Sequence, residues 1–135
     1  MRLKHHLRKG AAAVEFAILL PFLAFLFVAA VDWGRIFYYS VTVTNCARNG
    51  ALYASDPILQ AASPYSNVTE AALADAPNLS PTPSVDTTTG ADSNGPYVEV
   101  TVSYPFQTVT NFPGIGSGGP IARTIRMHVA PTTPK

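Results

Sequence analysis

Residues 11–31 read AAAVEFAILLPFLAFLFVAAV and contain one charged side chain, Glu15. A helix rises about 1.5 Å per residue, so about 20 apolar residues span the ~30 Å hydrocarbon core of a bilayer. A buried core helix is the alternative reading, but the remaining chain has too few large apolar residues to wrap one. The stretch therefore predicts one transmembrane helix, in which Pro21 removes a hydrogen bond and causes a kink or a local opening.

The charges that flank this stretch predict its orientation. Four basic residues and no acidic residue precede it, namely Arg2, Lys4, Arg8 and Lys9. Basic residues mark the cytoplasmic side of a membrane helix, so we expect the N-terminus in the cytoplasm and the chain after residue 31 on the other side. Aromatic side chains suited to the membrane interface follow the stretch at once: Trp33, Phe37, Tyr38 and Tyr39.

Glu15 is unusual because a carboxylate at the centre of a membrane helix costs about 2.5–3.5 kcal/mol on insertion scales. An ionisable residue kept there is by default a functional candidate. The alternative is that Glu15, near the start of the stretch, reaches the headgroups at little cost. A cleaved secretory signal ending near Val28-Ala29-Ala30 is also open, although its apolar core is usually only ~7–15 residues long and lacks an acid.

The bulk composition points to one modest domain and excludes several classes of protein. The chain has 135 residues, a formal net charge of +1, 12 prolines and nine glycines, most of them after residue 56. Its folded part shows no basic patch of the kind a nucleic-acid binder carries. The single cysteine, Cys46, excludes an intramolecular disulfide; we expect a small buried residue, with an intermolecular bridge as the alternative.

The helix is expected to continue beyond the membrane, because residues 32–55 contain no proline. Pro57 then ends it, and Asp56 is pushed towards extended geometry. A helix over 11–55 would be about 67 Å long. One stripe recurs at steps of three and four residues and would pack on the chain's own sheet or on neighbouring subunits: Ile36, Tyr39, Val43, Ala47, Ala51 and Ala54. Gly50 weakens this helix by about 1 kcal/mol relative to Ala.

The remaining chain predicts a small, loop-rich α+β domain. Asn67 and Glu70 form a capping box for a short helix over 68–75, and residues 80–96 are expected to be an exposed loop. Residues 97–104 and 121–129 alternate as half-buried strands and should pair antiparallel on the stalk helix across a flexible loop at 113–120. Because two strands alone are marginal, a third is expected near residues 108–112.

No catalytic or metal-binding pattern is present in the sequence. The Gly-rich segment 113–120 lacks the Gly-Lys-Ser/Thr ending of a phosphate-binding loop. His5 and His6 lie in the basic leader and His128 stands alone, so no metal site is expected. We therefore expect a protein that is not an enzyme and that has no cofactor, no metal and no nucleic-acid partner.

Two sets of motifs resemble a known family. The order Arg8-Lys9-Gly10, then Ala11-Ala12-Ala13-Val14-Glu15-Phe16, resembles the class III signal of the type IV pilin superfamily. A longer set resembles the TadE-like family of pseudopilins, from the tight-adherence (type IVc) pilus system: Glu15-Phe16-Ala17, Leu20-Pro21, Asp32-Trp33-Gly34-Arg35 and Asn45-Cys46-Ala47-Arg48-Asn49-Gly50-Ala51-Leu52-Tyr53-Ala54.

The resemblance implies a site of processing and a site of assembly. A prepilin peptidase would cut between Gly10 and Ala11, where glycine leaves an accessible, extended backbone. Glu15 would then be the fifth residue of the mature chain and, with Phe16, would serve assembly by pairing with the Ala11 amine of a neighbouring subunit. The implied partners are the peptidase, other pilins and pseudopilins, the pilus assembly machinery and membrane lipid.

The same resemblance implies the domain order and the location. Residues 1–10 would be a basic leader, 11–31 a transmembrane helix, 32–56 a helical stalk and 57–135 the extracytoplasmic domain. The protein would be a single-pass protein of the bacterial inner membrane, with incorporation into the surface pilus as a further step. The alternative function is an uncleaved, single-pass scaffold protein of a secretion complex.

Overall fold

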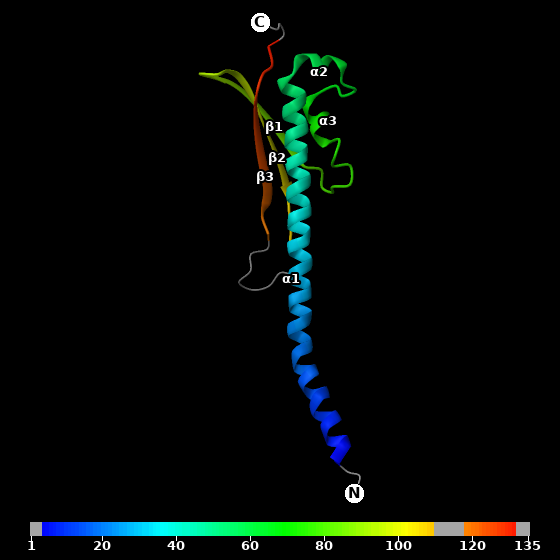
Figure 1. The fold of residues 1–135 in the computed structure, drawn as a ribbon. Helices are drawn as coiled ribbons and strands as arrows, with labels where there is room; N and C mark the ends of the chain where they lie inside the picture. The colour runs from blue at the N-terminus through cyan, green and yellow to red at the C-terminus, as the bar shows by residue number, and fades with distance from the viewer. Residues whose placement is uncertain (1–3, 110–117, 132–135) are drawn as a thin grey trace.

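The structure, a computed structural model, describes residues 4–109 and 118–131, with side chains from residue 10 onward. Figure 1 shows one long helix with a small sheet and two short helices gathered around its upper half. The elements in chain order are α1 (Lys4–Ser55), α2 (Pro57–Ala62), α3 (Val68–Leu73), β1 (Ser84–Asp92), β2 (Gly95–Pro105) and β3 (Pro120–His128). The predicted class, α+β with a long N-terminal helix and a small antiparallel sheet, is confirmed.

Helix α1 has two parts that differ in what surrounds them. Its lower part stands apart from the rest of the fold, whereas its upper part packs against β2, β3 and α3. Pro21 lies inside the helix, which continues through it and bends in its lower third (Figure 1). The segment from Gly10 onward is long and apolar enough to cross a membrane, and its most apolar window is not buried by the protein at all.

The end of α1 follows the prediction and adds a helix that was missed. Asp56 is extended (φ −121°, ψ 102°), and its side chain accepts hydrogen bonds from the backbone N–H groups of Ile58 and Leu59, at 2.9 and 3.1 Å. This cap, with Pro57 in the first turn, starts α2. Pro57 therefore ends one helix and begins the next.

The capping residues of α3 are those the sequence predicts. The Asn67 side chain accepts from the Glu70 N–H at 2.8 Å, as a capping residue does. The Glu70 carboxylate accepts from the Ser66 N–H at 2.8 Å, one residue before the cap, so the box is shifted by one position. The helix ends at Leu73, shorter than the predicted 68–75.

The sheet has the order β1-β2-β3, with both pairs antiparallel. Strands β2 and β3 confirm the two predicted strands and their pairing, with Val100 opposite Ile125. The prediction that residues 80–96 form a loop is wrong: β1 occupies most of them and pairs with β2, Thr87 opposite Val100. Strand β1 consists mostly of Ser, Thr, Asp and Gly, residues typical of loops, and the β-branched Thr side chains are stabilised by pairing rather than by burial.

Of the third strand predicted near 108–112, Thr108 and Val109 are outside any strand, and 110–112 lie outside the described residues. Of the predicted flexible loop 113–120, residues 113–117 also lie outside them. Gly118 adopts a positive φ of 89°, and β3 begins at Pro120.

The core lies between α1 and the sheet. The alternation predicted for β2 is confirmed, because Val98, Val100, Val102 and Tyr104 are all buried. The predicted helical stripe meets them: Val43, Ala47 and Ala51 are fully buried, and Ile36, Tyr39 and Ala54 pack at the edge of the cluster. The stripe therefore packs against the chain's own sheet.

Gly50 and Cys46 mark where α1 comes closest to its neighbours. A Cβ at Gly50 would lie 3.0 Å from Ala72 Cβ in α3 and 3.1 Å from Val100 Cγ1 in β2. The glycine therefore permits close packing that offsets its cost in helix propensity. Cys46 is fully buried in this core as a free thiol, which confirms the prediction of a small buried residue.

Candidate functional site

The peptide bond between Gly10 and Ala11 lies inside α1, and both residues are exposed. Nothing among the described residues lies within 4 Å of a Cβ built on Gly10, so the backbone there is sterically open. The expectation of extended backbone at Gly10 is wrong, because the helix continues through it. The three alanines that follow have the highest helix propensity and carry the helix back towards Lys4.

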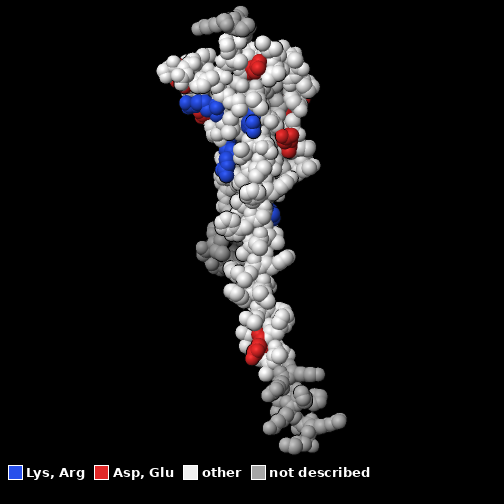
Figure 2. Space-filling model, in the orientation of Figure 1, with Lys and Arg blue, Asp and Glu red and all other residues white. Residues whose placement is uncertain are grey.

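Glu15 lies five residues further along the same exposed helix. Among the side chains described from residue 10 onward, none forms a hydrogen bond or an ion pair with it. Phe16, its neighbour, is 59% exposed. Figure 2 shows the described segment above the grey residues as white, apart from a red acidic patch. The fold therefore brings Gly10, Ala11, Glu15 and Phe16 onto one open segment but does not enclose any of them.

The surface around Glu15 is apolar and uncovered. Every large apolar side chain between residues 14 and 27 has at least a third of its surface exposed, from Phe25 at 36% to Phe27 at 72%. A soluble monomer rarely exposes so large a contiguous apolar surface; lipid or other apolar helices would cover it. The geometry thus fits a helix that works in a membrane or in a bundle.

Asp32 holds the sheet to the helix just above this apolar segment. Its side chain is buried, and its carboxylate Oδ1 accepts from the Val109 N–H at 2.9 Å and from Arg35 Nη1 at 3.1 Å. The hydrogen bond to Val109 joins residues 77 positions apart in the sequence. Asp32 therefore fixes the segment that follows β2 to the base of the stalk.

Arg35 extends this junction through aromatic rings. Its guanidinium carbon lies 5.2 Å from the centroid of the Phe106 ring and 5.9 Å from that of Tyr39. The Tyr39 ring stacks on Tyr104 at 4.8 Å between centroids. Cation–π contacts of this kind add roughly 0.5–1 kcal/mol at exposed sites and more when desolvated. The sequence marked Asp32 and Arg35 only as part of a motif; their sequence spacing gives no signal of the contact with Val109 and Phe106.

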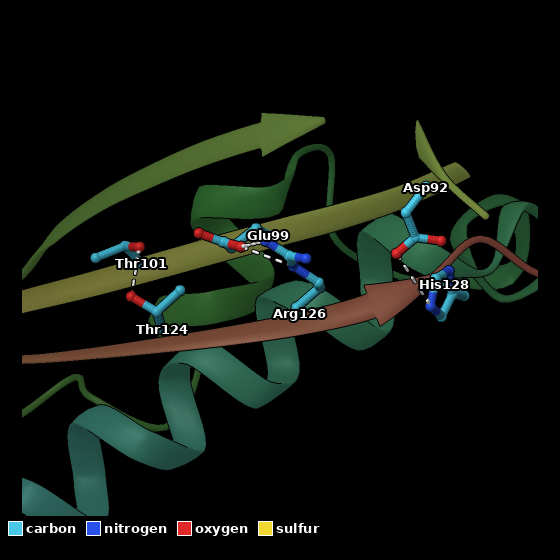
Figure 3. Close-up of polar contacts among 6 residues, drawn as sticks. All are labelled: Asp92, Glu99, Thr101, Thr124, Arg126 and His128. Atoms are coloured by element: carbon cyan, nitrogen blue, oxygen red, sulfur yellow. Dashed lines mark hydrogen bonds and ion pairs between the residues drawn. The ribbon is translucent and has the colours of Figure 1, made fainter. Parts of the chain in front are cut away.

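The outer face of the sheet, which points away from α1, carries a row of polar pairs. Figure 3 shows three of them along the strands. Arg126 pairs with Glu99 at 2.9 Å, and His128 Nε2 lies 3.8 Å from Asp92 Oδ2. The Thr101 and Thr124 hydroxyls are 2.8 Å apart. The guanidinium of Arg126 also lies 4.1 Å from the centroid of the Tyr97 ring.

These polar pairs are spread along a flat surface and do not converge on one point. Within residues 10–109 and 118–131, no three His, Cys, Asp or Glu side chains come together as metal ligands would. A shallow hollow of ≈ 300 Å³ lies between α1, α2 and α3, and its lining is mostly apolar, including Leu52, Tyr53, Leu59 and Tyr65.

Comparison with known proteins gives one match. Residues 10–52 match the family model described as TadE-like protein. The matched segment begins at Gly10 and contains Glu15, Asp32 and Cys46, so it covers the open helix and the stalk but not the sheet. No curated protein and no solved structure matches the chain.

Proposed function

Residues 10–52 are a TadE-like segment, and from this premise we propose that the protein is a minor pilin or pseudopilin. A prepilin peptidase processes it, and it takes part in assembly of a tight-adherence (type IVc) pilus. The observation that carries the proposal is the TadE-like match on a helix whose lower part is apolar and uncovered by the rest of the fold. Such a helix suits an anchored subunit that packs beside other membrane helices.

The proposed location is the bacterial inner membrane. Residues 1–10 lie in the cytoplasm, 11–31 cross the bilayer, and the stalk with its sheet stands on the other side. The basic leader supports this orientation. The partners are then the peptidase on the cytoplasmic face, lipid around the helix, and other pilins with the assembly machinery. The protein acts by packing rather than by catalysis.

Processing at Gly10 needs local opening of α1, since the bond to be cut is helical. Glycine helps, because it lowers the stability of a helix by about 1 kcal/mol relative to Ala. N-terminal sequencing of the membrane-extracted protein, with and without the peptidase, tests the proposal. Ala11 as first residue supports processing, Met1 in the presence of peptidase favours the uncleaved scaffold, and Val31 indicates a secreted product.

A Gly10→Val chain should insert normally and keep its leader; if it shifts to the mature size, the site is wrongly assigned.

Glu15 is proposed to act in assembly, by pairing with the Ala11 amine of a neighbouring subunit. A buried ion pair is favourable only when both members are present, and removal of one leaves an uncompensated charge that costs about 3–5 kcal/mol. Glu15→Gln should therefore insert and be processed, but should lose co-purification with partner pilins. Ile18→Gln is the matched control, since it adds the same amide at another exposed position of the helix. Normal co-purification of Glu15→Gln would show that the carboxylate merely reaches the headgroups.

The uncleaved scaffold remains the second candidate because α1 continues unbroken from Lys4 through Gly10. In that case residues 4–9 would be a working part of the helix rather than a leader. A chain that starts at Ala11 after an added cleavable signal would then fail to function, whereas a processed pilin would tolerate it.

A further inference from the structure

The sheet has two edges that run in the same direction. Strand β1 is antiparallel to β2, and β2 is antiparallel to β3, so β1 and β3 are parallel to each other on opposite edges. Within residues 4–109 and 118–131, no further strand pairs with either edge. An edge strand offers unpaired backbone groups to any strand that meets it.

Strand β1 lacks the features that usually protect such an edge. Its sequence, SVDTTTGAD, has no proline, lysine or arginine, and from Asp86 to Thr89 every residue is exposed. Proteins commonly blunt edges with Lys, Pro or a bulge. Thr87, Thr88 and Thr89 are β-branched and favour extended backbone. Nine residues of open edge are thus available for pairing.

The two edges carry opposite charges. Strand β1 has Asp86 and Asp92 and no basic residue, whereas β3 has Arg123 and Arg126 and no acidic residue. Asp86 and Asp92 lie on the outer face of the sheet, the same face as Arg126 and His128. Arg126 is already paired with Glu99, but its side chain is 52% exposed and the guanidinium has further donors for a second carboxylate. A β1 edge therefore complements a β3 edge and repels another β1 edge.

Membrane anchoring decides which edges can meet. Two chains held in one membrane in the same orientation have their strands pointing the same way, so an antiparallel β1–β1 pair, which reverses one chain, is excluded. A parallel β1–β1 pair would set acid beside acid. A parallel pair of β1 with β3 satisfies both the direction and the charge.

We propose that β3 of a second copy of this chain, anchored in the same membrane, adds in parallel to the free edge of β1. The contact joins two different edges, so each copy keeps one edge free and the sheet can grow from copy to copy; such head-to-tail contacts build rings or open filaments. This pairing relies on one part of the proposed function, the shared orientation of the copies in the membrane, and does not require processing at Gly10. The edge pairing can therefore fail while processing is confirmed, and the reverse can also occur.

Cysteine cross-linking of the full chain in its membrane tests this pairing. Thr88→Cys in β1 is combined with Ala122→Cys or with Thr124→Cys in β3, all on the outer face. Within one chain these positions are separated by β2, and Thr88 is in register with Arg126 rather than with Ala122 or Thr124. Their Cα atoms are therefore more than about 9–10 Å apart, the width of two strand spacings, which exceeds the ~7 Å limit of a disulfide. Mild oxidation can therefore link them only between chains. Cys46 stays in place because it is fully buried.

The expected result is a ladder of dimers, trimers and larger species in at least one of the two double variants, and only monomer in each single variant. A dimer from Thr88→Cys alone would show that like edges meet and would overturn the proposal, as would monomer in every variant. Adding Asp86→Lys to the cross-linking pair should lower the yield about fivefold. Ser103→Lys, which introduces a lysine on the central strand instead of on the edge, is the control; equal yields from the two would refute the role of charge at the edge.

Discussion

Replacing Asp32 by Ala should detach the base of the sheet from α1. The substitution removes the carboxylate that accepts from the Val109 N–H at 2.9 Å and from Arg35 at 3.1 Å. A hydrogen bond to a charged group contributes about 1.5–3 kcal/mol. The ion pair adds little because Arg35 is 34% exposed, and half-exposed pairs contribute about 0–1 kcal/mol. The free energy of unfolding should therefore fall by about 2–3 kcal/mol.

A loss of this size is large beside the ~5–15 kcal/mol that stabilises a typical domain. For a folded part of 60–100 residues it corresponds to a fall in Tm of about 10–20 °C. The assay is thermal unfolding of the full chain in detergent, followed by circular dichroism and by the fluorescence of Trp33, the only tryptophan. Trp33 lies next to the altered position, so its emission should change in the native baseline as well.

Two further substitutions separate the causes. Asp32→Asn keeps an oxygen that can accept from Val109 but loses the charge, so it should cost only about 1 kcal/mol. Asp75→Ala removes an exposed carboxylate that accepts a hydrogen bond from Asn49 at 2.7 Å, and should cost less than about 1 kcal/mol. If Asp32→Ala unfolds at the same temperature as Asp75→Ala, the junction does not hold the sheet and the reasoning fails.

Two other sites give predictions that urea unfolding and thiol labelling can check. Gly50→Ala should destabilise the fold by about 1 kcal/mol or more despite the better helix propensity of Ala, because the new Cβ would crowd Ala72 and Val100. Gly34→Ala is the control: a Cβ at this position would have nothing within 4 Å, so the substitution should be neutral or stabilising. Equal effects of the two alanines would contradict the close packing at Gly50. Burial first, and then nearby Asp75, raise the pKa of the Cys46 thiol, so the native protein should resist alkylation at pH 8 while the unfolded chain reacts. The unfolded chain loses the thiol proton at lower pH than the native protein does, so the free energy of unfolding should fall as pH rises above the ordinary thiol range. Cys46→Ala should remove this pH dependence. Rapid alkylation of the native protein would show that the site around Cys46 opens.

The sequence predicted those parts of the fold whose periodicity is long and regular. The apolar stretch and the stripe from Ile36 to Ala54 recur over many turns, so the helix could be placed from residue 11 to residue 55, although it begins earlier, at Lys4. The alternation of valines in β2 was equally clear. Strand β1 could not be found this way, because its face pattern is polar on both sides and its order comes from pairing with β2. The sequence marked Asp32 as part of a motif but did not indicate its role, because its hydrogen bond with Val109 depends on the tertiary structure.

The upper stalk limits how this helix can pack on neighbouring subunits. Of the two partners that the sequence left open for the stripe, the chain's own sheet covers Val43, Ala47 and Ala51 completely. A neighbouring helix therefore cannot use that stripe above the membrane. What remains open is a second line at four-residue steps, with Trp33 74%, Phe37 73% and Val41 45% exposed. From residue 10 to residue 27 no such division exists, because every residue is exposed. Helix contacts in the membrane can thus form on most sides, whereas those in the stalk are limited to its exposed face, which includes the line through Trp33, Phe37 and Val41 and the neighbouring Tyr38, 54% exposed. A polar substitution at Phe37 would interrupt this face without touching the core.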